Sequence, residues 1–301
     1  TGVESIKAFL KIKPHDREIV LGSAKVLEIL NPGLAELLVR GSEHLPFKHC
    51  HIREIEVLSK KNSIVNELAP QFLGSFIDFN KEAFVLIQEL IGDNWNISEI
   101  INLDKWTDQA KENAIKKIAR MHGHFLNQEA NVKMLSSSII DMCSAEKIDE
   151  QIDLWDGLFT LSYSELKTNY PVLFQFYGES LSSFESVLTE AAGLPKTLIH
   201  YDFNPRNIAF SQSNEIKIFD WEFSAWGLPQ RDLVEFVLFA NTDSSIIQNF
   251  ETLSKLHYDL IYPNREISYE IWLKGCWPWF TRWRQPRGWH LPPALTIPMS
   301  L

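Results

Sequence analysis

The sequence predicts an α+β protein of two lobes, with a small antiparallel sheet at the N-terminal end and a mostly helical C-terminal part. Three observations support this prediction. Short runs rich in Val, Ile and Leu, separated by turn residues, occupy much of the first 50 positions. A long segment that begins at Thr107 carries apolar residues at helical spacing. Two short β-type runs around a polar turn near residue 212 indicate a hairpin in the second half of the chain.

The length of the chain bounds its domain organisation. At 301 residues it suits one large bilobal unit or two tightly packed domains. We expect the first lobe to span residues 1–91 and the helical lobe to span residues 92–301, with the boundary where an apolar strand gives way to Gly92.

The N-terminal lobe is expected to begin with a short amphipathic helix over residues 4–12. The apolar runs that follow are expected to pair as an antiparallel meander of Glu18–Leu21, Lys25–Leu30, Leu34–Arg40 and Leu45–Cys50. The turn residues Asn31-Pro32-Gly33 and the segment 41–44 separate these runs. Further along, Glu82–Ile91 has the composition of a buried strand.

The C-terminal lobe contains the clearest predicted helix, which starts at Thr107. This threonine is a good N-cap, and apolar residues then recur at helical spacing as far as Phe125. We expect His122 and His124 in this helix to be structural. Weaker periodicity predicts helices over 148–163, 170–184 and 186–192, and no site residue is assigned there.

A tail rich in tryptophan and arginine begins near Trp272. We expect it to form a helix that packs on the large lobe. The alternative is an aromatic wall for a cationic or hydrophobic acceptor, to which each ring contributes roughly 1–2 kcal/mol by cation–π contact.

The predicted hairpin carries the side chains from which a function can be argued. Its strands lie near 208–210 and 216–219; Asp202 precedes it, Asn207 stands at its start and Asp220 follows it. This arrangement suits phosphoryl transfer. A carboxylate base must lie beside the attacking hydroxyl, while an amide and a second carboxylate must hold Mg²⁺ against the nucleotide phosphates.

The spacing of these residues is that of a kinase catalytic loop, H-x-D-x-x-x-x-N over residues 200–207. Together with Phe-Asp-Trp-Glu at 219–222, it resembles the aminoglycoside phosphotransferase and choline kinase superfamily. The segments Ile118–Gly123 and Gly227–Leu233 are also similar to that superfamily. These proteins are small-molecule kinases, so the resemblance implies a protein-kinase-like fold.

The resemblance also implies roles for residues near the hairpin. Asp202 would be the catalytic base, and Asn207 and Asp220 would bind Mg²⁺. His200 would anchor the loop through backbone contacts, and Asp232 would brace the same loop by hydrogen bonds.

In the N-terminal lobe, the resemblance implies a lysine that contacts the α- and β-phosphates and pairs with a glutamate on a helix. We assign Lys48 and Glu54 to these positions, with Glu56 as the alternative glutamate. The turn at 31–33 would be the loop that covers the phosphates.

The end of the predicted strand Glu82–Ile91 would be the hinge between the lobes. Backbone groups at Glu89 and Ile91 would contact the nucleotide base there. Because side chains at a hinge do not discriminate between bases, ATP is expected and GTP stays possible as the donor.

Composition excludes some classes of partner. The net charge of -10 argues against routine nucleic-acid binding and is compatible with a cationic small-molecule acceptor. No apolar run approaches the roughly 18–20 residues of a membrane helix, and no leader is visible. The three cysteines show neither metal spacing nor an even disulfide framework, so we expect a cytoplasmic protein without a membrane partner.

Three functions therefore compete. The first is a kinase for an aminoglycoside, amino sugar or similar hydroxylated metabolite. The second is a choline- or ethanolamine-type kinase, favoured by Asp220-Trp221-Glu222 and the tail tryptophans. The third is a non-catalytic pseudokinase that binds nucleotide. The acceptor and the oligomeric state are left open.

Overall fold

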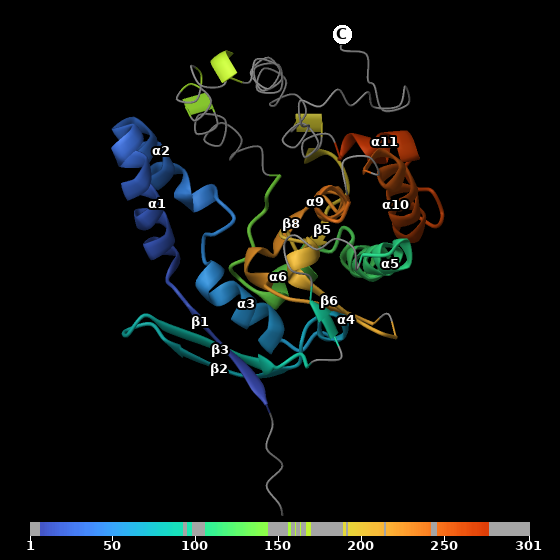
Figure 1. Cartoon of the computed structure of the whole chain (residues 1–301), viewed down its shortest axis with the longest axis horizontal. Coiled ribbons are helices and arrows are strands. Elements are labelled where there is room, and N and C mark those ends of the chain that lie inside the picture. Colours follow the sequence, from blue (N-terminus) through green and yellow to red (C-terminus); the bar gives the residue numbers. More distant parts are fainter. Residues whose placement is uncertain are drawn as a thin grey trace, which may run out of the picture.

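The computed structural model describes residues 7–92, 95–97, 106–143, 156–157, 160, 163, 167–169, 189–190, 192–213, 215–241 and 246–276. The described residues form a small N-terminal sheet followed by a mainly helical C-terminal part, so the predicted α+β class is confirmed (Figure 1). Several predicted features lie largely or wholly outside the described residues, namely the helices over 148–163, 170–184 and 186–192 and the tail beyond residue 276. Within the described residues, no helix is long and apolar enough to cross a membrane.

The N-terminal part contains β1 (Ala8–Lys13), α1 (Asp16–Leu30), α2 (Pro32–Gly41), the 3₁₀ turn η1 (Ser42–His44), α3 (Cys50–Ser59), α4 (Ser63–Leu68), β2 (Phe72–Asp78) and β3 (Ala83–Glu89). Its three strands form an antiparallel sheet in the order β1-β3-β2. Phe84 and Leu86 of β3 are fully buried and belong to the same core as Ile55 and Leu58 of α3. Helix α3 therefore lies against the inner face of this sheet (Figure 1).

The meander predicted over residues 18–40 is wrong, because this segment forms the helical hairpin α1–α2. Asn31 is the N-cap of α2: its side chain accepts a hydrogen bond from the Gly33 backbone N–H at 2.9 Å, and Pro32 occupies the first helical position. The turn at 31–33 is thus a helix cap and lies outside the sheet. Buried Ala24 and Leu38 pack the two helices together.

The helix predicted over residues 4–12 is also wrong for the part from residue 7 onward, which the structure describes. Residues 8–13 form β1, which pairs with β3 from Ala8 opposite Glu89 to Lys13 opposite Phe84. The sequence Ala-Phe-Leu-Lys-Ile-Lys places Lys11 and Lys13 on one face of the strand, because side chains alternate between faces. That face is the one toward α3.

The C-terminal part contains β4 (Trp95–Ile97), α5 (Asp108–Phe125), α6 (Glu129–Leu135), β5 (Thr197–Ile199), the 3₁₀ turn η4 (Pro205–Asn207), β6 (Ile208–Ser211), β7 (Ile216–Ile218), the 3₁₀ turn η5 (Trp221–Phe223), β8 (Ala225–Gly227), α9 (Gln230–Phe239), α10 (Ile246–Ile261) and α11 (Tyr269–Lys274). The predicted cap of α5 is confirmed, since Thr107 Oγ1 accepts from the Ala110 N–H at 3.2 Å.

The predicted hairpin is confirmed as β6–β7, with Ile208 opposite Ile218 and β4 paired on the outer side of β6. Strand β5 precedes the hairpin in the chain and β8 follows it, and these two strands pair with each other. One apolar core joins the hairpin to α5, α9 and α10, and it continues into α3 and β3. The loop that follows β5 is consequently held by packed elements on both sides.

Candidate active site

The loop between β5 and β6 fixes Asp202 through amide side chains. The Asn207 Nδ2 donates hydrogen bonds to Asp202 Oδ2 at 2.6 Å and to the Asp202 carbonyl at 2.9 Å. The Asn204 Nδ2 donates to Asp202 Oδ1 at 2.8 Å. Both carboxylate oxygens therefore have a donor, yet 23% of the Asp202 side chain is exposed and can be reached by a small molecule. The structure brings Asp202 and Asn207 together, as their spacing predicts.

A buried carboxylate holds the backbone at the start of this loop. Asp232 at the N-terminal end of α9 accepts from the backbone N–H of His200 at 2.7 Å and from that of Tyr201 at 2.8 Å. Tyr201 has a positive φ of 69°, a conformation that two such hydrogen bonds stabilise. The His200 Nε2 bonds the Phe219 carbonyl at 2.7 Å. His200 and Asp232 thus lie where they can brace the loop.

Asp232 is further held by the buried histidine His122, whose Nε2 lies 3.1 Å from Asp232 Oδ2. Burial on its own would raise the pKa of Asp232, but the hydrogen bond and charge of His122, with His200, outweigh it and lower the pKa. The His122 Nδ1 in turn lies 2.9 Å from the His257 Nε2. The expectation that His122 is structural agrees with this buried position, and His124 is exposed.

Two lysines of β1 meet three carboxylates at the exit of the hairpin. The Lys11 Nζ lies 2.9 Å from Glu54 Oε2 and 2.5 Å from Asp220 Oδ1. The Lys13 Nζ lies 2.8 Å from the same Glu54 oxygen and also pairs with Glu222. The Glu54 side chain is fully buried, and its other oxygen accepts from the Trp221 backbone N–H at 3.2 Å.

Charge in this cluster shifts two pKa values. Burial would lower the pKa of Lys11, but the carboxylates of Glu54 and Asp220 outweigh it and raise the pKa above its ordinary value. Burial, and after it the neighbouring charge of Asp220, raises the pKa of Glu222 despite its contact with Lys13. Lys11 is therefore firmly charged, and three carboxylates lie close together.

The predicted pairing of Lys48 with Glu54 is wrong. Lys48 lies in the turn before α3 rather than on a strand, and its amine pairs with Glu43. The Lys48 carbonyl also accepts from the Arg53 guanidinium, which holds the turn against α3. The signal that could have identified Lys11 was the alternation Phe-Leu-Lys-Ile-Lys, which has the period of a strand.

The choice between the two candidate glutamates on α3 is decided by the helix geometry. Glu54 points to the lysines, whereas Glu56 Oε2 accepts from the hydroxyls of Ser136 at 2.5 Å and Ser138 at 3.0 Å. Residues two apart on a helix lie on different faces. Glu54 is therefore the partner of the lysine pair.

The two residues predicted at the hinge lie where β3 ends. Glu89 is the last residue of β3, and its Oε2 accepts from the Gln71 backbone N–H at 3.2 Å. Ile91 follows two residues later and is half-buried. Contact of either residue with a nucleotide base stays a prediction.

The donor set at the exit of the hairpin fits a hard divalent cation. Glu54, Asp220 and Glu222 each offer a carboxylate oxygen, and these atoms lie within 4.8 Å of one another. Asn207 is adjacent, since its carbonyl accepts from the backbone N–H of Phe219 at 2.8 Å. Its amide nitrogen makes both bonds to Asp202, so the amide oxygen is the atom that can bind a cation. Mg²⁺ prefers such oxygen ligands.

Comparisons with known proteins agree with these motifs. The model of the phosphotransferase enzyme family matches residues 151–255. Comparison with curated proteins gives no match.

Two solved structures illustrate the distant likeness of this chain to known folds. One is an aminoglycoside phosphotransferase from Alicyclobacillus acidocaldarius, with 12% identity, a TM-score of 0.49 and coverage of 80% of this chain and 72% of that one. Another is the choline kinase LicA from Streptococcus pneumoniae, with 17% identity, a TM-score of 0.44 and coverage of 85% and 78%. These TM-scores are too low for either likeness to carry an argument about this chain.

The family match spans the catalytic-loop motif at 200–207 and the Phe-Asp-Trp-Glu motif at 219–222. The resemblance predicted from these motifs is therefore confirmed. The match over residues 151–255 covers about a third of the chain, so it shows that this segment is similar to the phosphotransferase enzyme family.

Proposed function

We propose that this protein is a small-molecule kinase, which transfers the γ-phosphate of a nucleotide to a hydroxyl of an aminoglycoside, amino sugar or similar metabolite. One observation supports the proposal above others. The Lys11 amine bridges Glu54 and Asp220, at 2.9 Å and 2.5 Å, directly beside the loop in which Asn207 holds Asp202. A lysine–glutamate pair, a metal-binding acid and a base are the parts that phosphoryl transfer requires.

Lys11 rather than Lys48 is the residue we assign to the α- and β-phosphates of the nucleotide. The side chains of both lysines are 24% exposed, but the Lys11 amine contacts the fully buried Glu54, whereas Lys48 pairs with the exposed Glu43 outside the sheet. Glu54 positions Lys11 through the 2.9 Å contact. The backbone around Glu89 and Ile91 is where the base of ATP, or of GTP, would lie.

Asn207 and Asp220 are the residues that would hold Mg²⁺, with Glu222 as a further carboxylate. When bound, the ion neutralises charge on the transferring phosphates. Asp220 is suited to this task because its side chain is 33% exposed and follows the rigid hairpin. Lys11 then has to exchange part of its contact with Asp220 for contact with phosphate oxygens.

Asp202 takes the proton of the acceptor hydroxyl. Two amide donors hold its carboxylate in one orientation, and the hydrogen bonds that Asp232 accepts from the backbone N–H groups of His200 and Tyr201 fix the loop that carries it. Positioning of this kind supplies much of the rate enhancement in phosphoryl transfer, because the protein takes little part in the covalent chemistry of the transfer.

A choline- or ethanolamine-type kinase is the second candidate. Glu222 supports it, because this carboxylate lies in the site and 20% of its side chain is exposed, so it can attract a cationic acceptor. The same residue pairs with Lys13, which weakens that attraction. A nucleotide-binding pseudokinase is the third candidate, and experiment separates it from the other two.

The experiment is nucleotide turnover with Mg²⁺, using ATP and GTP separately and a panel of aminoglycosides, amino sugars, choline and ethanolamine. Release of ADP or GDP that depends on one acceptor supports the proposal and identifies the acceptor class. Nucleotide binding by calorimetry without turnover on any acceptor argues for the pseudokinase.

A matched pair of variants tests the base. Asp202→Asn should lower kcat by about 10²–10⁴-fold, because the amide cannot take a proton, and should leave the Kd of the nucleotide nearly unchanged. Asp259→Asn is the control, since Asp259 lies on α10 with 49% of its side chain exposed. Turnover by Asp202→Asn at the rate of the control contradicts the assignment of the base.

A further inference from the structure

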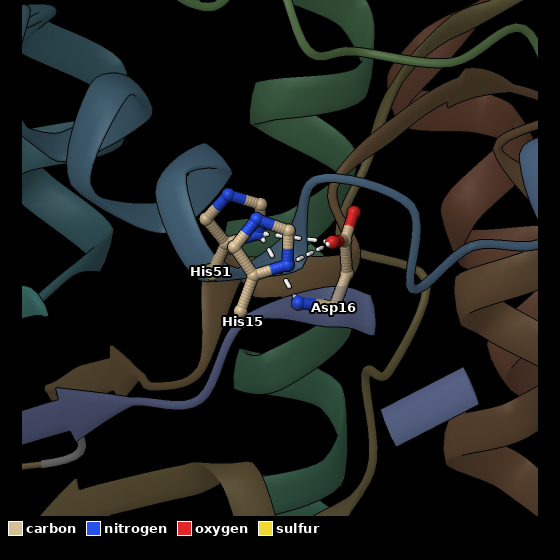
Figure 2. Close-up of side chains that lie close together, drawn as sticks. All are labelled: His15, Asp16 and His51. Carbon is tan, nitrogen blue, oxygen red and sulfur yellow. Dashed lines mark hydrogen bonds and ion pairs between the residues drawn. The ribbon is translucent and has the colours of Figure 1, made fainter. Parts of the chain in front are cut away.

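A second cluster of metal-binding side chains lies where β1 passes into α1. His15 and Asp16 occupy this junction, and His51 lies in the first turn of α3 (Figure 2). One ligand atom from each side chain lies within 4.8 Å of the other two. The imidazole rings of His15 and His51 stack with centroids 4.3 Å apart, and the Asp16 carboxylate faces the same edge of both rings (Figure 2).

The nitrogen atoms of the two rings converge on one carboxylate oxygen. The Nδ1 of His15 lies 2.7 Å from Asp16 Oδ1, and the Nδ1 of His51 lies 3.6 Å from the same oxygen. Each Nδ1 also accepts a backbone N–H, from Arg17 at 3.1 Å and from Asp16 at 3.4 Å. Two imidazole nitrogens and one carboxylate oxygen, all of them ligand atoms that a transition metal accepts, therefore lie beside one another.

Backbone N–H groups hold the Asp16 carboxylate in place. The His49 N–H donates to Oδ2 and the Arg17 N–H donates to Oδ1, each at 2.7 Å. Partners behind a metal ligand commonly fix its orientation in this way.

We propose that His15, Asp16 and His51 form a site for a transition-metal ion, with Zn²⁺ the best match. Two imidazole nitrogens and one carboxylate oxygen are a common zinc ligand set, and they leave a fourth tetrahedral position for water. Mg²⁺ fits poorly, since it prefers oxygen ligands. The site is thus chemically distinct from the carboxylates around Asp220.

One ring must turn for both lone pairs to point at a shared ion, because the stacked rings are only 20° from parallel. His15 is the ring that can turn, since 27% of its side chain is exposed against 4% for His51. The bond that His51 gives up is the 3.4 Å contact with the Asp16 N–H, which is near the long limit of a hydrogen bond.

The ion would join the two elements that carry the lysine–glutamate pair. Lys13 precedes His15 by two residues on β1, and Glu54 follows His51 by one helical turn on α3. Binding of the ion would therefore fix the end of β1 against α3. The site itself does not depend on the kinase proposal, because metal binding is measured without turnover.

The experiment uses the full chain without a histidine tag, stripped of metal by a chelator and titrated with Co²⁺. One equivalent of Co²⁺ should give the visible absorption of a tetrahedral site, and Zn²⁺ but not Mg²⁺ should displace it. Zn²⁺ should also raise the unfolding temperature, since an ion that binds only the folded state stabilises it.

Two variants and one control make the test specific. His15→Ala and Asp16→Asn should each weaken Co²⁺ binding by at least about tenfold. His124→Ala, an exposed histidine on α5, should bind as the wild type does. Circular dichroism checks that each variant is folded; should Asp16→Asn fail to fold, His15→Ala alone decides. Absence of a tetrahedral spectrum in the wild type, or an unchanged spectrum in folded His15→Ala, overturns the proposal.

Discussion

Replacing Lys11 by methionine tests which lysine binds the nucleotide. Methionine keeps an unbranched apolar side chain of similar length and removes the charge. The matched variant is Lys48→Met, at the lysine that lies outside the sheet and pairs with Glu43. The quantity to measure is the Kd of Mg·ATP for the wild type and for both variants.

The structure sets the expected magnitude. Removing one partner of a buried, hydrogen-bonded charge pair costs about 2–5 kcal/mol. We expect a cost at the low end of this range for Lys11, because 24% of its side chain is exposed. In addition, the Lys13 amine lies 4.0 Å from Asp220 and can partly replace the lost positive charge. A loss of about 2–3 kcal/mol corresponds to a Kd raised roughly 30- to 150-fold. Surface ion pairs such as that of Lys48 contribute at most about 1 kcal/mol, or roughly fivefold.

Isothermal titration calorimetry with Mg·ATP measures these Kd values without an acceptor. Thermal unfolding of the nucleotide-free variants shows whether the fold is retained. Equal weakening by the two substitutions, or a larger effect of Lys48→Met, refutes the assignment of Lys11. A larger effect of Lys48→Met would also restore Lys48 as the phosphate-binding residue.

Two further predictions concern stability. Lys13→Met should lower the free energy of unfolding by about 3 kcal/mol, because the buried amine of Lys13 neutralises Glu54 and Glu222; an unchanged urea midpoint contradicts this. Burial, opposed by Arg231 and reinforced by the charge of Asp202, raises the pKa of Glu235 from 4.5 to about 7. Since the folded state then binds the extra proton, stability should fall as pH rises from about 4.5 to 7 by at most roughly 3 kcal/mol. Glu235→Gln should flatten this slope in urea unfolding series at each pH, and a slope equal to that of the wild type argues against the raised pKa.

The sequence predicted the segments in which local signals agree. The hairpin β6–β7 and the cap of α5 were predicted correctly, because a polar turn between β-type runs and a threonine before an apolar period act over a few residues. The motif at 200–207 identified Asp202 and Asn207 together, and the structure places their side chains 2.6 Å apart. Spacing within one loop is sufficient for such a prediction.

Prediction from the sequence failed where short apolar runs were compatible with either a helix or a strand. Segment 18–40 contains runs with the composition of strands, yet it forms α1 and α2 because Asn31 caps a helix and the apolar residues pack helix on helix. Propensity in short runs is weak, and tertiary packing overrides it. The helix expected over residues 4–12 is wrong for the same reason, since residues 8–13 form β1.

The sequence alone therefore indicated the resemblance to the phosphotransferase family, the motif at 200–207 and Glu54 as the preferred glutamate on α3. Only the tertiary structure decided that the partners of Glu54 are Lys11 and Lys13 rather than Lys48. The physical reason is that the register of β1 on β3 selects which side chains face α3. Glu54 lies 43 positions from Lys11 and 41 positions from Lys13, so no pattern within a short stretch of sequence connects them. The convergence of His15, Asp16 and His51 was likewise created by folding, since 35 positions separate Asp16 from His51.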